Sequence, residues 1–169
     1  MIRVQEEDFD AGKEIRALTR GKKRIGGVAS FIGLVRESTN NETISSLTLE
    51  HYPGMTEKIL EQIEKDARER WSLHEVLVIH RIGRMEPGEQ IVLVVTTSAH
   101  REAALKSCQF LIDKLKTGAP FWKQEDTPKG SHWVTERPDD INASERWDTE
   151  TKAECARFNH GSGDLTKAS

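Results

Sequence analysis

The chain has 169 residues, of which 36% are hydrophobic and 31% are charged, and its formal net charge is −3 at pH 7. This length fits one domain with a proper hydrophobic core. The slightly acidic balance gives no reason to expect bulk attraction to nucleic acid or to an anionic membrane, so local clusters of cations must bind any anion.

The sequence shows no targeting segment and no cysteine framework. The longest apolar run, at 91–95, is far too short to span a bilayer, and the first four residues lead directly into acidic ones without the apolar core of a secretory signal. We therefore expect a cytoplasmic protein. Two cysteines are too few for a disulfide framework or a zinc site, and Cys108 is expected to be a buried core thiol.

The N-terminal half is predicted to alternate strands and helices. Its expected elements are a strand at 2–5, a helix at about 10–20, a strand at 26–35, a polar loop at 37–43, a strand at 46–52 and a helix at 55–71. Alternating polarity predicts a half-buried strand with Leu47, Leu49 and His51 on one face. Apolar residues spaced four apart predict that the segment 55–71 is an amphipathic helix.

The C-terminal half continues this pattern. Its expected elements are strands at 75–82 and 90–98 with a turn at 86–89 between them, a helix at about 99–118, and strands at 121–125 and 131–136 joined by a hairpin at 127–130. Continuous apolar runs predict that the first two strands lie in the middle of a covered sheet. The helix stops at Gly118, with Pro120 two residues later. Its expected core stripe is Ala104, Leu105, Cys108, Leu111, Ile112 and Leu115.

The element order βαββαββαββ predicts the fold class. It is not the steady alternation of a doubly wound fold, so we expect an α+β domain with a mixed, mainly antiparallel sheet. Residues 1–147 are expected to form one domain. The polar segment 148–169 lacks periodicity and is expected to be a disordered tail.

Several familiar kinds of site are excluded by motif. The sequence has no Walker A loop, no GxGxxG motif opening a helix, no GxSxG and no HExxH. Its six histidines are scattered without close ligand pairs, so we expect no metal site.

Two lysines flank the turn after the long C-terminal helix. Lys116 follows the last core position, where a cation is favourable by a few tenths to about 1 kcal/mol, so a purely structural role is one interpretation. Lys123 lies between Trp122 and Gln124 in a predicted strand with partly buried aromatic neighbours. Folded back by the turn, the two lysines could share one pocket, where mutual repulsion and desolvation favour a neutral amine suited to nucleophilic or proton-transfer chemistry.

Three further cations could bind an anion. His100 and Arg101 follow a strand and begin a helix, a place suited to phosphate or carboxylate, although Ser98 could simply cap a helix whose first residues are exposed. Arg36 ends a glycine-containing strand and by itself reads as a surface charge. Since a helix rises about 1.5 Å per residue, His100 and Lys116 stand about 24 Å apart. Either the two ends serve different purposes, or a second copy of the chain completes the site.

Three aromatic residues lie near the lysines. Phe121, Trp122 and Trp133 could stack on a flat heterocycle. Aromatic residues on paired strands are usually core, and the core interpretation is favoured here.

Several long motifs resemble the large, catalytic subunit of molybdopterin synthase, in order and register from about residue 26 to 147. They are FIGLVR (31–36), SLTLEHYPGMTEK (46–58), VIHRIGRMEPGE (78–89), TSAHREAA (97–104), LKTGAPFWKQE (115–125) and GSHWV (130–134). The resemblance implies an α/β hammerhead-type fold, a homodimer, and a heterotetramer with two small ubiquitin-like subunits. It also implies transfer of two sulfurs from the thiocarboxylated C-terminal Gly-Gly of the small subunit to cyclic pyranopterin monophosphate, without a metal or cofactor.

The resemblance assigns roles to particular positions. Lys123 matches the residue for proton transfer and substrate activation, and Lys116 the one beside the thiocarboxylate. Arg36, with His100 and Arg101 of a neighbouring subunit, matches the pocket for the substrate phosphate. Phe31 and Arg137 match residues that line the site.

One position departs from the family pattern, and two alternative functions remain open. Gly118 stands where many relatives are expected to have a larger or basic residue, so the turn between the lysines is expected to be looser. The chain could instead be a non-catalytic scaffold for a ubiquitin-like partner. It could also bind single-stranded nucleic acid through Lys116, Lys123, Trp122 and Trp133, which the acidic net charge disfavours.

Overall fold

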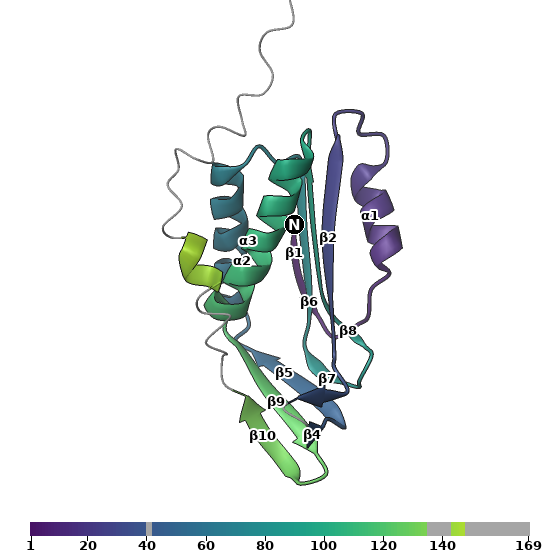
Figure 1. Cartoon of the computed structure of the whole chain (residues 1–169), viewed down its shortest axis with the longest axis vertical. Coiled ribbons are helices and arrows are strands. Elements are labelled where there is room, and N and C mark those ends of the chain that lie inside the picture. Colours follow the sequence, from purple (N-terminus) through teal and green to yellow (C-terminus); the bar gives the residue numbers. More distant parts are fainter. Residues whose placement is uncertain (40–41, 135–142, 148–169) are drawn as a thin grey trace, which may run out of the picture.

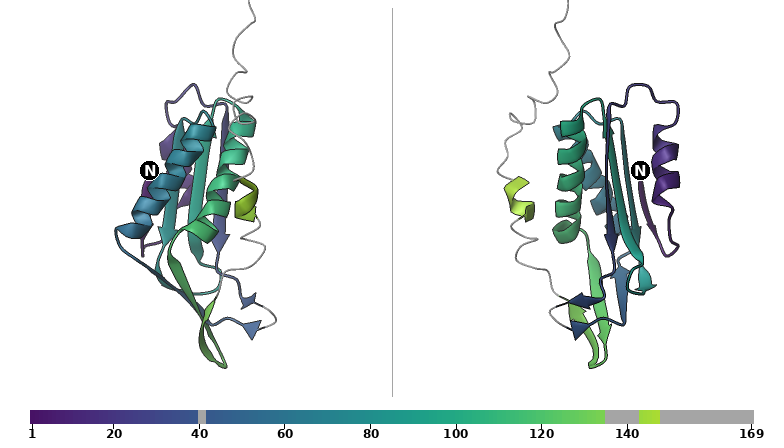
Figure 2. Two further views of the ribbon diagram at one scale, coloured as in Figure 1. Left: turned by 90° about the vertical axis from the view of Figure 1, so that its left-hand side faces the viewer. Right: turned by 45° about the vertical axis from the view of Figure 1, so that its right-hand side comes forward.

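The computed structural model describes residues 1–39, 42–134 and 143–147. Its centre is a four-stranded sheet with helices on both faces (Figures 1 and 2). The strands, in spatial order, are β1 (Ile2–Gln5), β6 (Glu75–Arg81), β8 (Gln90–Ser98) and β2 (Gly27–Leu34). β1 runs parallel to β6, and the other pairs are antiparallel. The predicted mixed, mainly antiparallel α+β arrangement is therefore confirmed.

The central sheet is buried on both faces because its middle strands contain continuous apolar runs, residues 76–79 of β6 and 91–95 of β8. Val92 and Val94 of β8 face one helical layer, α2 (Met55–Arg70) and α3 (Arg101–Gly118). Leu93 and Val95 point the other way and pack with Leu18 of α1 (Ala11–Thr19). The continuous apolar runs in the sequence thus correspond to central strands, as predicted.

A second sheet adjoins one end of the first. It consists of β10 (Gly130–Val134), β9 (Phe121–Thr127), β5 (Ser46–His51) and β7 (Gly83–Met85), all antiparallel. Leu47 and Leu49 form its small core with Val35 and Met85. Figure 1 shows this sheet at the lower end, where β2 and α3 also finish. The loop expected at 37–43 is not wholly irregular, since it contains β3 (Ser38–Thr39) and β4 (Glu42–Thr43).

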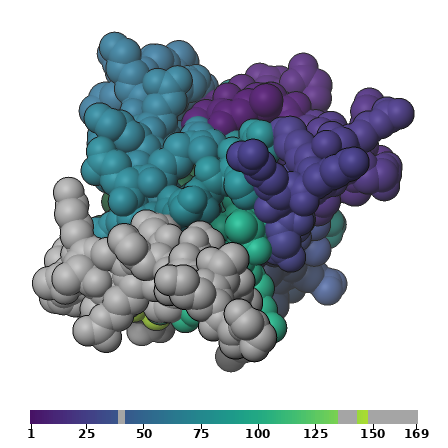
Figure 3. Space-filling model, turned by 90° about the horizontal axis from the view of Figure 1, so that it is seen from above, coloured from purple at the N-terminus to yellow at the C-terminus, as the bar shows by residue number. Residues whose placement is uncertain are grey.

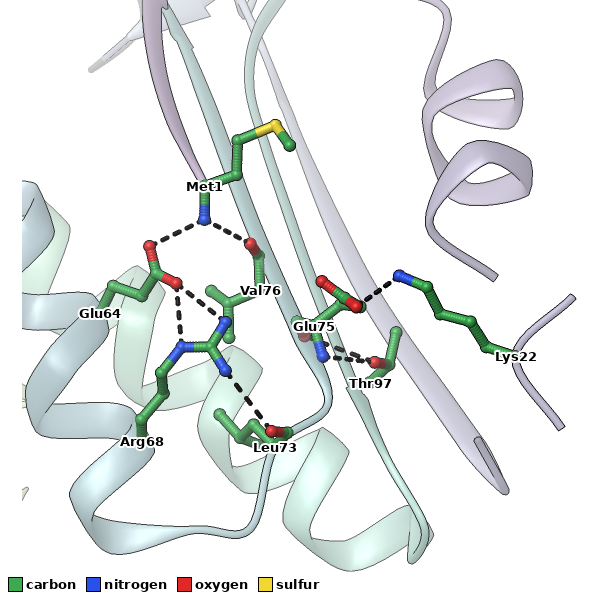
Figure 4. A network of polar contacts seen from close by, with 8 residues as sticks. All are labelled: Met1, Lys22, Glu64, Arg68, Leu73, Glu75, Val76 and Thr97. Atoms are coloured by element: carbon green, nitrogen blue, oxygen red, sulfur yellow. Dashed lines mark hydrogen bonds and ion pairs between the residues drawn. The ribbon is translucent and has the colours of Figure 1, made fainter. Parts of the chain in front are cut away.

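Polar contacts tie the first strand to the helical layer. The α-amino group of Met1 donates to Oε2 of Glu64 at 2.8 Å and to the carbonyl oxygen of Val76 at 2.7 Å (Figure 4). Glu64 also pairs with Arg68, one turn later in α2, at 2.9 Å. These contacts join β1 and β6 to α2.

The predicted core of α3 needs one correction. Leu105 is 62% exposed, whereas Ala103, Ser107 and Phe110 are buried. At 100° per residue, the face that meets both the sheet and α2 is centred on 104, 107 and 111, so Leu105 points away from it. Cys108 is buried, as predicted.

Aromatic contacts connect the end of α2 to the last described residues. Trp71 ends α2 as an extended residue, and its ring packs against those of Phe110 and Trp147. The tail expected at 148–169 lies outside the described residues. No helix in the described ranges is long and apolar enough to cross a membrane.

Candidate active site

Arg36 and Lys123 line one hollow where β2 meets the second sheet. Apolar side chains of Ile44 and Leu47 complete the walls, and Glu125 lies at its side. The hollow has a volume of about 30 Å³, which is room for a water-sized group. Two predicted site residues that are 87 positions apart in sequence are thus brought together within one subunit.

The strand pairing of β9 explains the position of Lys123. β9 pairs with β5, so Lys123 lies opposite Leu49 and Glu125 lies opposite Leu47. Alternate strand residues share a face, which places both side chains on the buried side of the second sheet. The Lys123 Nζ atom lies 2.7 Å from Oε1 of Glu125. Glu125 is only 2% exposed, and a buried carboxylate requires such a partner.

The charged group beside Lys123 is the carboxylate of Glu125 and not the amine of Lys116. The sequence suggested that Lys116 and Lys123 could share one pocket, where they would repel each other, but the group beside Lys123 is Glu125. Lys116 lies in the last turn of α3, is exposed, and is not among the residues that line the hollow. Gly118 ends the helix after one further residue, and β9 then begins at Phe121. Lys116 therefore belongs to the end of α3 that leads into the second sheet (Figure 1), but it does not line the hollow.

Arg36 is positioned by its buried neighbour. Val35 is 4% exposed, donates its amide to Glu89 at 2.9 Å and accepts from Gly88 at 2.8 Å. These contacts hold the backbone just after β2, while the Arg36 side chain is exposed beside the hollow.

His100 and Arg101 lie at the opposite end of α3, as Figure 1 shows. His100 is the N-cap residue without a capping side-chain bond, and Ser98 Oγ accepts from its backbone amide at 3.3 Å. Both side chains are exposed. One subunit therefore does not bring this pair together with Lys123.

The aromatic predictions are only partly right. Trp122 is 49% and Trp133 is 53% exposed, so the core interpretation is wrong for both. They lie on the face of β9 and β10 opposite to Lys123, because alternate residues point to opposite sides. Phe121 is partly buried against the core. Phe31 is 38% exposed on β2, and Arg137 lies outside the described residues.

Two buried polar residues were missed from sequence. Glu125 follows Lys123 by two residues in a strand, a spacing that by itself indicates a shared face. His80 stacks on Phe121, and its Nδ1 lies 2.9 Å from the carbonyl oxygen of Arg81. Burial lowers the pKa of His80 to about 4. The described ranges contain no cluster of residues able to hold a metal ion.

Comparisons with known proteins place the chain among close relatives. The family model described as MoaE protein matches residues 4–118. The molybdopterin synthase catalytic subunit of Ralstonia nicotianae is 53% identical over 86% of this chain and 83% of its own length. The molybdopterin biosynthesis MoaE protein from Burkholderia ambifaria has a TM-score of 0.76 and 47% identity, over 89% of this chain and 99% of that one. A complex of subunits 1 and 2 of molybdopterin-converting factor from Helicobacter pylori, 22% identical over 80% of this chain and 91% of that one with a TM-score of 0.68, shares the fold.

Proposed function

The chain belongs to the MoaE family, and on that premise we propose that it is the catalytic subunit of a molybdopterin synthase. The enzyme transfers sulfur from the thiocarboxylated C-terminus of a small ubiquitin-like subunit to cyclic pyranopterin monophosphate. Two such transfers form the dithiolene of molybdopterin. The observation that carries this function is the hollow in which Arg36 and Lys123 meet over buried Glu125.

The described part of the chain offers no sulfur donor of its own. Burial raises the pKa of the Cys108 thiol to about 11, so this cysteine is not a thiolate at neutral pH and cannot act as a donor. A carrier with a thiocarboxylate tail supplies the sulfur instead. Its extended tail docks by backbone contacts near the hollow, where Lys116 orients the thiocarboxylate and stabilises charge on the acyl group as sulfur leaves.

Lys123 is the acid–base group of the reaction. Its amine is held by Glu125 at 2.7 Å, and this carboxylate is itself fixed because it is buried in the second sheet. A lysine positioned in this way can give a proton to the departing oxygen of the substrate and take one back, which contributes about 10²–10⁴-fold to rate. Arg36 lies on the same hollow and binds the substrate phosphate.

A second copy of the chain completes the site. A hollow of about 30 Å³ is far smaller than the roughly 300–1,000 Å³ of pockets that enclose small molecules. Among the described strands, β2 pairs only with β8, so its outer edge is open. That edge carries four exposed apolar residues, Val28, Phe31, Ile32 and Leu34. Exposed apolar edges invite strand pairing, and natural proteins usually cover them.

A twofold axis through the middle of β2 joins the two distant groups of cations. This axis makes the two copies of β2 antiparallel. The C-terminal end of β2, which Arg36 follows, therefore lies beside the N-terminal end of the partner's β2, which begins at Gly27. Gly27 lies against Arg101, since a Cβ atom there would be 3.0 Å from the Arg101 Cα. His100 of the partner subunit and Arg101 of the partner subunit thereby join Arg36 in one phosphate pocket. Phe31 lies near the axis.

The assembly is a heterotetramer of two such chains and two small subunits in the cytoplasm. A two-subunit arrangement is known for the Helicobacter pylori molybdopterin-converting factor. The exposed Trp122 and Trp133 do not favour a nucleic-acid platform, because Glu50 lies directly opposite Trp122 on the same face. A carboxylate at this position repels phosphate.

Reconstitution with defined components tests the function. The purified chain is mixed with thiocarboxylated small subunit and cyclic pyranopterin monophosphate, and the pterin product is analysed by mass spectrometry. The expected product carries two sulfur-for-oxygen exchanges, and the small subunit returns to its carboxylate form. Tight binding of the small subunit without any sulfur in the pterin would instead identify a non-catalytic scaffold.

A further inference from the structure

A second, larger hollow lies at the end of the molecule where α3 begins. Residues 21–25, in the loop between α1 and β2, form one wall, and His74 and Glu75 form the other. Its volume is about 450 Å³, which is within the range of about 300–1,000 Å³ typical of small-molecule pockets. Figure 3 looks onto this end, where the indigo loop stands out from the surface.

The lining of this hollow is cationic. Lys22, Lys23 and Arg24 contribute three positive charges against the single carboxylate of Glu75. Lys22 pairs with Glu75 (Figure 4), whereas Lys23 and Arg24 are exposed and make no ion pair within the described part of the chain. Since the whole chain has a net charge of −3, this is a local concentration of positive charge that attracts anions.

The walls are held in place and contain an unsatisfied group. Glu75 donates its backbone amide to Thr97 Oγ1 at 2.8 Å, and its side chain anchors the loop through Lys22. The Nε2 atom of His74 is buried and has no hydrogen-bond partner in the described ranges. A buried polar atom without a partner is costly, so a ligand oxygen that reaches it is stabilised.

The loop is coupled to the predicted phosphate-binding pair. Gly26 donates its amide to the carbonyl of Ser98 at 2.9 Å. A Cβ atom on Gly26 would lie 2.2 Å from the carbonyl oxygen of Ala99, so only glycine permits this approach. The basic loop therefore ends directly against the backbone that carries His100 and Arg101, and both cationic groups belong to one end of the molecule.

We propose that the hollow between loop 21–25 and His74–Glu75 binds the phosphate of the anionic pterin, as a staging site next to the His100–Arg101 end. The identity of the pterin rests on the proposed function, whereas the existence of a phosphate site does not. In the dimer, this end faces the partner's Arg36, so the staging site lies at the entrance to the pocket where sulfur is transferred.

Equilibrium binding to the complete heterotetramer tests the proposal. Inorganic phosphate is titrated while the amide resonances of residues 21–25 are followed by NMR, and cyclic pyranopterin monophosphate is titrated by calorimetry. The double variant Lys23→Glu/Arg24→Glu is compared with Lys13→Glu/Lys58→Glu, which makes the same change in net charge at exposed positions outside the hollow. We expect the first variant to weaken phosphate binding at the loop at least tenfold and pterin binding several-fold, beyond any change in the control.

The outcomes separate this proposal from the proposed function. Equal phosphate affinity in the two double variants, or no response of residues 21–25 in the unaltered protein, overturns the phosphate site. Loss of phosphate binding with unchanged pterin binding overturns the staging role and leaves a site for free phosphate. If the loop variant behaves as expected but the unaltered heterotetramer transfers no sulfur, the phosphate site stands and the proposed function fails.

Discussion

The ring of His80 stacks on the ring of Phe121, with centroids 3.8 Å apart and planes 15° from parallel. His80 belongs to β6 of the central sheet, and Phe121 begins β9, the strand that carries Lys123. The stack therefore joins the rigid core of the domain to the strand that positions the proposed acid–base residue.

The burial of His80 predicts that the free energy of unfolding decreases in acid. Burial lowers the pKa of His80 from 6.5 to about 4 in the folded chain, so between these values only the unfolded chain takes up the proton. The stabilisation is complete above pH 6.5 and is lost as the pH falls towards 4, by roughly 3 kcal/mol in all. Urea unfolding from pH 7.5 to 4 measures it. The variant His80→Phe should show a flatter dependence, and parallel curves for the two proteins would contradict the assignment.

Variants of Lys123 and Glu125 are expected to affect activity and stability differently. Lys123→Ala should reduce sulfur transfer at least about 100-fold, while dimerisation and partner binding persist. It should also destabilise the fold by about 1–3 kcal/mol, because the buried Glu125 loses the closer of two basic neighbours, Lys123 at 2.7 Å, and keeps the more distant His132 at 3.8 Å. Lys123→Ala/Glu125→Gln should recover that stability but not the activity. Single-turnover assays and urea unfolding provide the two readouts, and normal turnover by Lys123→Ala would remove the mechanism.

The shared pocket predicts complementation between two inactive variants. Lys123→Ala and Arg101→Ala homodimers each have two defective sites. In a mixed dimer both defects fall in one site, and the other site is intact. A refolded equal mixture should therefore recover about a quarter of normal activity, since half the dimers are mixed and half of their sites are whole. Failure of the mixture to exceed the separate variants would show that each subunit uses its own Arg101.

Gly118 is expected to tolerate a side chain. It lies in the last turn of α3, and an added Cβ would meet only Ile63 Cδ1 at 3.7 Å. Gly118→Ala should stabilise the fold by about 0.5–1 kcal/mol, because alanine loses less backbone entropy in a helix. Gly54→Ala is the matched control and should destabilise by about 1 kcal/mol, since Gly54 has φ +79°. Thermal unfolding compares them, and a loss of stability in Gly118→Ala would indicate strain at the turn.

The helices and strands that could be predicted from sequence are those whose buried residues recur at regular spacing or form continuous apolar runs. The apolar runs of β6 and β8 and the four-residue spacing of α2 gave the central layers. β7, with three residues, is too short to show a period. The separation into two sheets depends on pairings such as Leu49 with Lys123, which join distant segments and leave no mark in either segment alone.

The site was predicted less completely, for a related reason. Lys123 and Arg36 were named from sequence and share one hollow. Glu125 was missed because an acidic residue in a polar strand resembles a surface charge, and its burial depends on a distant segment, that of Val35 and Arg36, which lines the same hollow. Trp122 and Trp133 were assigned to the core because residue type indicates burial only on average, whereas strand alternation decides the face.

The length of helix α3 matters for the proposed dimer, because the helix contributes to both proposed sites. Its 18 residues span about 27 Å, with His100 and Arg101 at one end and Lys116 at the other, and in the proposed twofold assembly each end reaches a different one of the two proposed sites. Inserting one residue in the middle would shift one end by about 1.5 Å and turn it by about 100°. The number of residues in α3 therefore fixes the distance and the relative orientation of the groups at its two ends. On the proposed arrangement, this number is as constrained as the identity of those groups.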